Sequence, residues 1–225
     1  MRETRIFAAP VEVRGTTDGS ATIAGYGAVF DTPYEVRGFT ESIARGAFDK
    51  SIAERYDDLA VLADHDPARV LGTTASGTAR LSVDAHGLYY EADLDLLDPD
   101  GMSTFRKIST GKVRQSSFAF EVPDGKDDWV ETEGMPHRTI REVKLWEASP
   151  VLWGANSSTQ VDLKRAARSL SVVLETDAGE TEQAITEGRL AAFFDARATT
   201  EQPEDEPREH SESTEQSEPV HYPFT

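Results

Sequence analysis

The 225-residue chain contains no cysteine, and this absence excludes disulfide bridges, a thiol nucleophile and zinc sites built on thiolates. It also has no apolar run near the roughly 18 residues that a membrane-spanning helix needs. Its first residues show no signal-peptide core. Hydrophobic residues make up only 38% of the chain, which indicates that part of it does not pack into a core. We therefore expect a soluble, intracellular protein.

Positive charge is scarce as well. The chain has 23 Lys and Arg against 41 Asp and Glu, and its formal net charge is -18. Because such a chain repels phosphate groups, we expect neither nucleic acid nor a membrane surface among its partners. Phosphate-binding and dinucleotide-binding glycine motifs are absent, and so is the GxSxG motif. The pair His65-Asp66 lacks a second well-placed histidine, so we expect no metal and no cofactor.

The composition changes near residue 165. Up to that point short apolar runs alternate with Gly, Asp and Pro, whereas residues 175–225 contain 14 acidic residues and 3 Arg. A segment with so little to bury is expected to stay disordered. The sequence therefore predicts a folded domain over residues 1–165 and an acidic, largely disordered extension over residues 166–225. A short amphipathic helix is predicted near residues 184–197.

The first 165 residues read mostly as strands. Alternating apolar runs predict strands over residues 23–29, 81–83, 88–94, 113–122 and 139–145. Gly87 ends a hairpin-type turn, where we expect a positive φ. Helices are predicted over residues 39–56, where Gly46 could divide the helix, and over residues 102–111, with Gly111 as its C-cap. Many short strands with few helices predict an α+β, mainly β fold, a barrel or sandwich with helical insertions.

Two adjacent serines stand out in VRQSSFAF, residues 113–120. Side chains alternate between the two faces of a strand, so Ser116 shares a face with Phe118 and Phe120. Those rings are expected to point into the core. Ser117 then faces the other way, beside the small Ala119, where a substrate chain has room. Ser117 is thus the candidate nucleophile, although serines in strands are commonly inert.

A nucleophilic serine needs a base, and an imidazole base is usually oriented by a third group. Of the five histidines, His210 and His221 lie in the acidic extension, and His86 and His137 lie in polar turns or loops where we expect them to be solvated. His65 follows an apolar run at strand parity, so we expect it at a strand end and partly enclosed.

Glu147 is the candidate for the third group, because it shares parity with Val143 and Leu145 on an apolar face. A carboxylate there is costly unless it is paired. Asp64 and Asp66 are alternatives, although neighbours in a strand point away from His65. The sequence also leaves open the alternative that the strand has ended and that Glu147 lies on the surface.

Five blocks of the chain resemble, in order and spacing, the prohead (capsid maturation) proteases of tailed bacteriophages, over roughly residues 4–165. The family is made up of serine peptidases that are distantly related in fold to the herpesvirus assemblins. The blocks are GYGAVFD, GFTESIARGAFDKSI, LADHDPARVLGTT, VRQSSFAF and LWEASPVLWGAN. They are similar to the family's E-x-I-x-x-GAF, HD-x-x-x-x-LG, GMSFGF-like and EVSxVxxxAN segments.

The resemblance implies a herpesvirus-protease-like β-barrel and a serine peptidase domain over residues 1–165. By position it implies that His65, Ser117 and Glu147 are the catalytic residues. Ser116 falls where the family often has Met. Ala119 and Gln115 replace glycines that the family often has, which changes the backbone near the serine.

The resemblance also implies a place and a substrate. The protein would cleave the scaffold or delta segments of the major capsid protein, and itself, inside the procapsid in the cytoplasm of the host bacterium, encoded by a phage or a prophage. The alternative from another class is a catalytically inactive scaffold or assembly module of the same fold. A plain β-rich binding domain is the third reading. Labelling of Ser117 by a serine-directed phosphonate would favour the enzyme.

Overall fold

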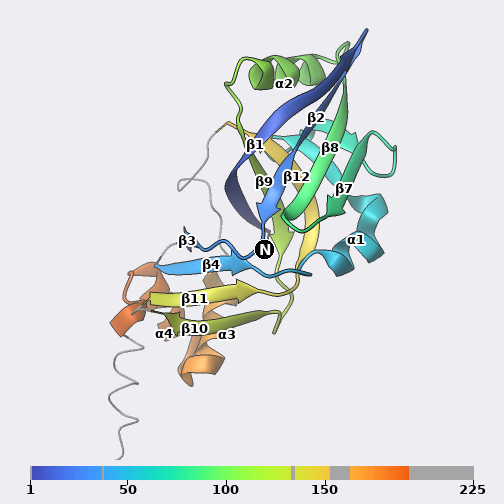
Figure 1. Cartoon of the computed structure of the whole chain (residues 1–225). Helices are drawn as coiled ribbons and strands as arrows, with labels where there is room; N and C mark the ends of the chain where they lie inside the picture. The colour runs from blue at the N-terminus through green and yellow to red at the C-terminus, as the bar shows by residue number, and fades with distance from the viewer. Residues whose placement is uncertain (1, 37, 133–134, 153–162, 193–225) are drawn as a thin grey trace, which may run out of the picture.

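The computed structural model describes residues 2–36, 38–132, 135–152 and 163–192, and nearly half of them form strands (Figure 1). Eight strands form one large sheet in the order β6-β5-β12-β9-β1-β2-β8-β7. In chain order they are β1 (Glu3–Thr17), β2 (Ser20–Val29), β5 (Ala60–Ala63), β6 (Asp66–Thr73), β7 (Ala79–Val83), β8 (Gly87–Asp95), β9 (Gln115–Glu121) and β12 (Lys144–Val151). This sheet curls so far that its two edge strands approach each other.

The approach of the edges can be followed at two residues. The backbone N–H of Thr73, the last residue of β6, donates to Thr78 Oγ1 at 3.1 Å, directly before β7. At Gly72 a Cβ would lie 2.7 Å from the carbonyl oxygen of Thr78, so only glycine allows this contact. The large sheet is therefore a nearly closed barrel, and the prediction of a mainly β, barrel-like fold with helical insertions is confirmed.

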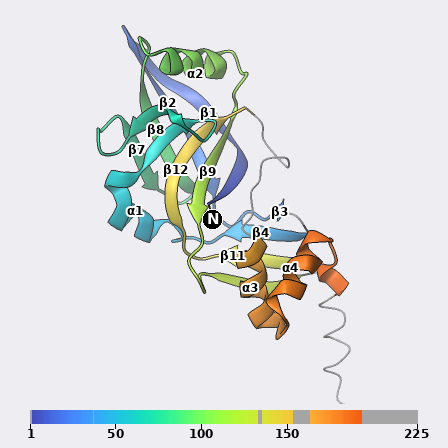
Figure 2. The ribbon, with the colours of Figure 1, turned by 180° about the vertical axis from the view of Figure 1, so that it is seen from behind.

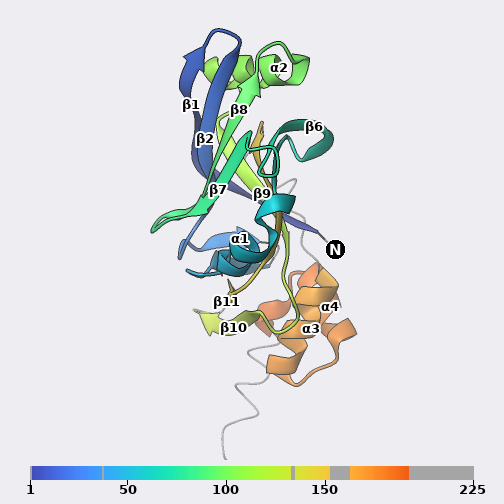
Figure 3. The same ribbon diagram turned by 90° about the vertical axis from the view of Figure 1, so that its right-hand side faces the viewer.

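A second sheet lies below the barrel in Figure 1 and has the order β10-β11-β4-β3. Its strands are β3 (Tyr34–Val36), β4 (Phe39–Ile43), β10 (Asp127–Thr132) and β11 (Met135–Ile140). The helices are α1 (Asp49–Arg55), the 3-10 turn η1 (Tyr56–Asp58), α2 (Pro99–Ser109), α3 (Leu163–Leu174) and α4 (Ala178–Thr186). Figure 3 shows α2 at one end of the barrel and α3 and α4 beside the small sheet at the other. No helix within the described ranges is long and apolar enough to cross a membrane.

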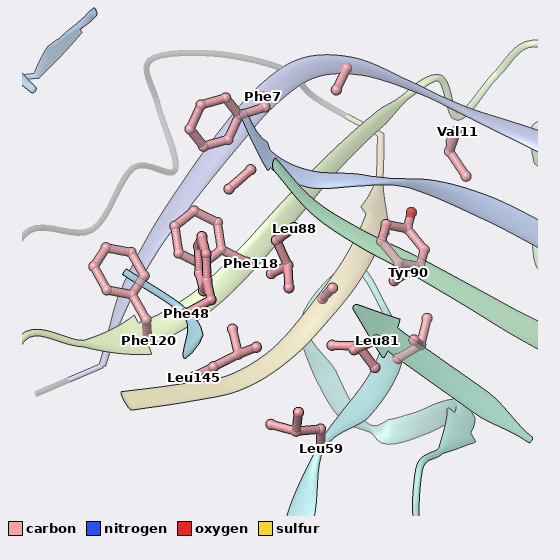
Figure 4. Packing of buried hydrophobic residues seen from close by; sticks show 14 of the residues in the cluster. Phe7, Val11, Phe48, Leu59, Leu81, Leu88, Tyr90, Phe118, Phe120 and Leu145 are labelled. Carbon is pink, nitrogen blue, oxygen red and sulfur yellow. The ribbon is translucent and has the colours of Figure 1, made fainter. Parts of the chain in front are cut away.

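The inner face of the barrel holds the main hydrophobic core (Figure 4). Phe118 and Phe120 of β9 stack with their ring centroids 4.5 Å apart, and Phe48 meets Phe118 edge-on at 5.4 Å. All three rings are fully buried. Each contributes roughly 1.5–3 kcal/mol by burial. The predicted inward direction of Phe118 and Phe120 is confirmed, and this direction fixes which face of β9 each serine occupies.

Several local predictions hold. The predicted helix over residues 102–111 is α2, which begins earlier because Asp98 caps it by accepting from the backbone N–H of Asp100 at 2.8 Å. Gly111 follows the helix with φ +68°, as the C-cap prediction requires. The strands predicted over residues 23–29, 81–83, 88–94 and 113–122 correspond to β2, β7, β8 and β9.

Three other local predictions are wrong. Residues 39–43 are not helical but form β4, because Phe39, Glu41 and Ile43 bury one face of the small sheet at a period of two. The single strand predicted over residues 139–145 is the end of β11 and the start of β12. Gly87 has no positive φ. Instead, a Cβ at this position would lie 1.9 Å from the carbonyl oxygen of Ala28, so the glycine is needed for close packing.

Residues 163–192 form a second, smaller core against the small sheet (Figure 2). Leu170 of α3 and Ile185 of α4 are fully buried in one cluster with Phe39 and Trp129. Residues 166–192 therefore differ from the largely disordered extension that was expected to start at residue 166. The helix predicted near 184–197 overlaps α4 only in its last turn, at residues 184–186. Residues 193–197 and the rest of that extension lie outside the described residues.

A buried group of charged side chains joins the barrel to the small sheet. It comprises Glu3 and Arg5 of β1, Glu41 of β4, Asp127 of β10 and Arg138 of β11, and we call it the ionic cluster. Arg5 Nε lies 2.6 Å from Glu41 Oε1, and Arg138 Nη1 lies 2.9 Å from Glu41 Oε2. Burial alone would raise the pKa of Glu41, but the attraction of the two guanidinium groups holds it below its ordinary value. The cluster fixes β1 against the small sheet.

Candidate active site

The two serines of β9 lie on opposite faces of the sheet, as predicted. Ser116 points into the barrel, where its hydroxyl lies 2.9 Å from the hydroxyl of Tyr90. Ser117 points outward and lies 2.6 Å from His65 Nε2. Both serines are 0% exposed. Alternation along β9 therefore separates a serine bound to a core tyrosine from a serine bound to an imidazole.

His65 sits at the tip of a hairpin and not at the end of a strand, which corrects the expectation. Asp64 and His65 are the two central residues of the turn between β5 and β6, with φ of 54° and 61°. Asp and His are among the residues that tolerate this left-handed conformation. The turn is tied to the end of β12, because the backbone N–H of Leu152 donates to Asp64 Oδ1 at 3.0 Å. These contacts hold the imidazole beside β12 and β9.

Glu147 reaches the outer face through a β-bulge in β12, and the parity argument from sequence is wrong on this point. Leu145 pairs with Phe120 and Glu147 with Ala119, so Trp146 is an extra residue between them. The Trp146 ring lies under the cationic ends of Arg55 and Lys144, each 4.5 Å from its centroid. Without the bulge Glu147 would follow Leu145 into the core; with it, Glu147 shares the face of Ser117.

The three side chains form a continuous hydrogen-bonded chain. His65 Nδ1 lies 2.5 Å from Glu147 Oε1, and His65 Nε2 lies 2.6 Å from Ser117 Oγ. Because an ionised carboxylate only accepts, Nδ1 carries the proton in this contact. In the neutral imidazole Nε2 is then free to accept from the serine hydroxyl. We call this arrangement the serine–histidine–glutamate chain.

The serine hydroxyl has a second acceptor within reach. The carbonyl oxygen of Arg5 on β1 lies 2.8 Å from Ser117 Oγ, and Ile6 is the cross-strand partner of Ser117. A hydroxyl has one proton, so it donates either to Arg5 or to His65. The imidazole side chain is 24% exposed, whereas Ser117 is not exposed at all. A neighbouring group must therefore move before a carbonyl group reaches Ser117 Oγ.

Sequence reasoning did not find Ser149. Its hydroxyl donates to Glu147 Oε2, and the residue is fully buried. Ser149 also pairs with Ser117 across β12 and β9. The signal was present in WEAS: a hydroxyl two residues after a candidate glutamate in one strand lies on the same face as that glutamate.

The other candidates occupy different places. Asp64 is engaged with Leu152 through one oxygen, and Asp66 Oδ1 accepts from the backbone N–H of Ala68 at 2.9 Å. His137 is not in a solvated loop but in β11, where Thr40 and Ser42 of β4 lie 2.8 and 2.9 Å from its two ring nitrogens. These contacts leave Glu147 as the carboxylate at His65.

His86 is exposed in the turn before β8, as expected. His210 and His221 lie outside the described residues. Within the ranges that the structure describes, no three His, Asp or Glu side chains gather in a way that could hold a metal ion.

Comparison with known proteins supplies an independent observation. The family model described as caudovirus prohead serine protease matches residues 9–174, well over half of the chain. Among solved structures, the bacteriophage T4 capsid assembly protease is similar at 16% identity, with a TM-score of 0.40 over 68% of this chain and 99% of that chain. No curated protein matches the chain in sequence. The family match, rather than the structural likeness, supports an assignment.

Proposed function

The chain belongs to the caudovirus prohead serine protease family, and on that premise we propose that it is a serine endopeptidase whose catalytic residues are Ser117, His65 and Glu147. One observation carries the proposal. Three side chains from different parts of the sequence meet on the outer face of one sheet, in hydrogen-bonding order and at 2.5 and 2.6 Å. A nucleophile, a base and an orienting group in this order are what acyl transfer through a serine requires.

In this mechanism Ser117 Oγ attacks the carbonyl carbon of the scissile peptide bond. As the new C–O bond forms, the hydroxyl proton passes to His65 Nε2. His65 then returns that proton to the leaving amine, and water completes the cycle by hydrolysing the acyl-enzyme. Glu147 stays ionised, keeps the proton of His65 on Nδ1 and stabilises the imidazolium that forms.

The carbonyl oxygen of Arg5 gives the Ser117 hydroxyl a second acceptor, and a serine that donates to it is not activated by His65. While the hydroxyl proton points at Arg5, it is not shared with His65, and the serine has no exposed surface. Catalysis then requires two local changes: the hydroxyl turns to Nε2, and a neighbouring group moves to admit the peptide.

We further propose that the substrates are the scaffold segment of the major capsid protein and the enzyme itself, cut inside the procapsid within the host cell. The family description, a serine protease of the prohead, supports this substrate class. Residues beyond α4 are then candidates for a segment that is removed by self-cleavage or that directs the enzyme into the procapsid.

The test is co-expression of the full chain with its capsid protein, followed by mass spectrometry of both. The wild type is expected to yield trimmed capsid protein and trimmed enzyme, whereas Ser117→Ala should yield both uncut. Ser116→Ala is the matched control, since its serine is equally buried but bonded to Tyr90. Processing that is unchanged in Ser117→Ala would contradict the assignment and favour a non-catalytic assembly module.

A further inference from the structure

Ser149 is a buried hydroxyl at the active site whose contact is with the carboxylate and not with the imidazole or the nucleophile. We propose that Ser149 is a positioning residue of the serine–histidine–glutamate chain: it holds Glu147 Oε2 so that Oε1 is aimed at His65 Nδ1. This inference rests on the proposed function and adds a fourth member to its machinery. The hydrogen bond from Ser149 Oγ to Glu147 Oε2 carries it.

The position of Ser149 is set by the main chain. It lies two residues after Glu147 in β12, beyond the bulge at Trp146, so both side chains share the outer face. β12 is an interior strand, paired with β5 on one side and with β9 on the other. The hydroxyl therefore approaches Glu147 from a rigid element, and its direction does not depend on a loop.

Glu147 needs such a partner because its side chain is almost fully buried. A glutamate has a flexible side chain, and its carboxylate can rotate about the last bond. With Oε1 alone engaged, that rotation would move the acceptor away from Nδ1. A second hydrogen bond, to Oε2, stops the rotation and satisfies an oxygen that is shielded from water.

Ser149 also lies beside the nucleophile, because it is the cross-strand partner of Ser117. Its single hydroxyl proton is committed to Glu147, so it does not compete with Ser117 for His65 Nε2. The outer face of β9 and β12 thus carries two serines with different tasks: one is placed against the base, and the other against the group that orients the base.

The experiment compares Ser149→Ala, Ser149→Thr and a matched control, Ser51→Ala, in the full chain. Ser51 is also buried, and its hydroxyl accepts from the backbone N–H of Leu145 at 2.9 Å, so its loss reports the cost of a missing buried hydroxyl next to β12. Two quantities are measured: kcat and KM for cleavage of purified capsid protein, and the downfield proton resonance of the His65 Nδ1–H, assigned by its loss in His65→Ala.

Ser149→Ala is expected to lower kcat about ten-fold with KM nearly unchanged, the size expected for one hydrogen bond to a charged group. The His65 resonance should shift or broaden in the same variant. Ser149→Thr keeps the hydroxyl and should restore both readouts, and Ser51→Ala should leave the resonance in place. If Ser149→Thr does not fold, the comparison of the two alanine variants still decides.

A wild-type resonance and kcat in Ser149→Ala, or equal changes in Ser149→Ala and Ser51→Ala, would overturn the proposal. The resonance does not depend on turnover, so it tests the positioning role of Ser149 separately from the proposed peptidase activity. A wild-type chain that cuts nothing would contradict the proposed function, and the response of His65 to Ser149→Ala would still decide the positioning role.

Discussion

The ionic cluster and the serine–histidine–glutamate chain are both buried polar groups, but they differ in charge and in exposure. The ionic cluster sets two guanidinium groups against three carboxyl groups, all shielded from water. The serine–histidine–glutamate chain contains one carboxylate, one imidazole and hydroxyls, and its imidazole is partly exposed. Opposite charges in direct contact stabilise a single arrangement. In the serine–histidine–glutamate chain a single carboxylate meets an imidazole, whose Nε2 lies against the hydroxyl of Ser117.

The two groups meet at Arg5. Its side chain belongs to the ionic cluster through Glu3 and Glu41, while its carbonyl oxygen accepts from Ser117. The cluster therefore fixes the segment of β1 that lies against the nucleophile. We therefore expect two separate roles. The ionic cluster should determine stability, and the serine–histidine–glutamate chain should determine activity. The following predictions test that separation, from the largest expected effect to the smallest.

Replacing the orienting carboxylate should affect activity strongly and stability little. In Glu147→Gln the amide can donate to Nδ1 and so favour the wrong tautomer of His65. We expect kcat/KM to fall by about 10²–10⁴-fold, as orienting carboxylates do in serine peptidases. Cleavage rates of the capsid protein, together with urea unfolding, measure both quantities. A variant that keeps full activity would show that Glu147 does not orient the base.

Breaking the ionic cluster should affect stability strongly and activity little. Arg138→Met removes the cationic partner of Asp127 and one of the two cationic partners of Glu41, so buried negative charge is left in excess. We expect the free energy of unfolding to fall by about 3–5 kcal/mol. Urea unfolding followed by tryptophan fluorescence measures it, since Trp129 lies in the adjacent core. A loss below about 1 kcal/mol would mean that the cluster is not the main tie between the two sheets.

The ionic cluster should also make stability depend on acid pH. The folded protein holds the pKa of Glu41 below its ordinary value, so the unfolded chain binds the proton more readily. The resulting stability is present above the ordinary pKa of a glutamate and is lost as pH falls through the folded value. Tyr34 donates to Glu41 Oε1 at 2.5 Å and helps to lower that pKa.

Tyr34→Phe removes this contact and brings the folded pKa of Glu41 closer to its ordinary value, so acid should destabilise the variant over a narrower pH range and by a smaller amount than the wild type. Urea midpoints recorded from pH 7 to pH 3 give the two curves. Curves that run parallel throughout would show that Glu41 does not titrate as described.

The smallest effect is expected at an exposed ion group on the barrel surface. Arg80 of β7 lies 2.9 Å from Glu91 and 2.8 Å from Asp93 of β8, but its side chain is 45% exposed. Water and salt screen these pairs, so Arg80→Ala should cost less than about 1 kcal/mol. Thermal unfolding at low and high salt measures it. A cost that matches Arg138→Met would contradict the role given to burial in this comparison.

The sequence was sufficient for the faces of β9. Alternation of Ser116, Ser117, Phe118 and Phe120 is a local property, and the core imposes it on the structure. It was not sufficient for His65 and Glu147. Their positions depend on a turn with two left-handed residues and on a bulge at Trp146, and neither leaves a periodic pattern. Exclusion of the other histidines and strand parity made His65 and Glu147 candidates, and the resemblance to a family selected the same two residues by position. Their geometry arises from these two irregularities.

Local sequence patterns predicted only part of the fold as well. The mainly β class and the helix α2 follow from local patterns and capping residues. The segment over residues 39–43 was predicted as part of a helix, yet it pairs with β3 and β11, and Phe39, Thr40 and Ile43 are residue types that favour strands. The acidic composition after residue 174 gave no indication of α4, whose buried face has only three residues, Thr181, Ala184 and Ile185. Tertiary packing decides both segments.

The central claim is that Ser117 is the nucleophile, and reaction with a serine-directed phosphonate tests it most directly. The full chain, in a preparation that cleaves its capsid protein, is treated with the reagent and digested, and the modified peptide is located by mass spectrometry. We predict one adduct on Ser117 in the wild type and in Ser116→Ala, and none in Ser117→Ala. An adduct on Ser116, or no adduct at Ser117 in an active preparation, would contradict the account.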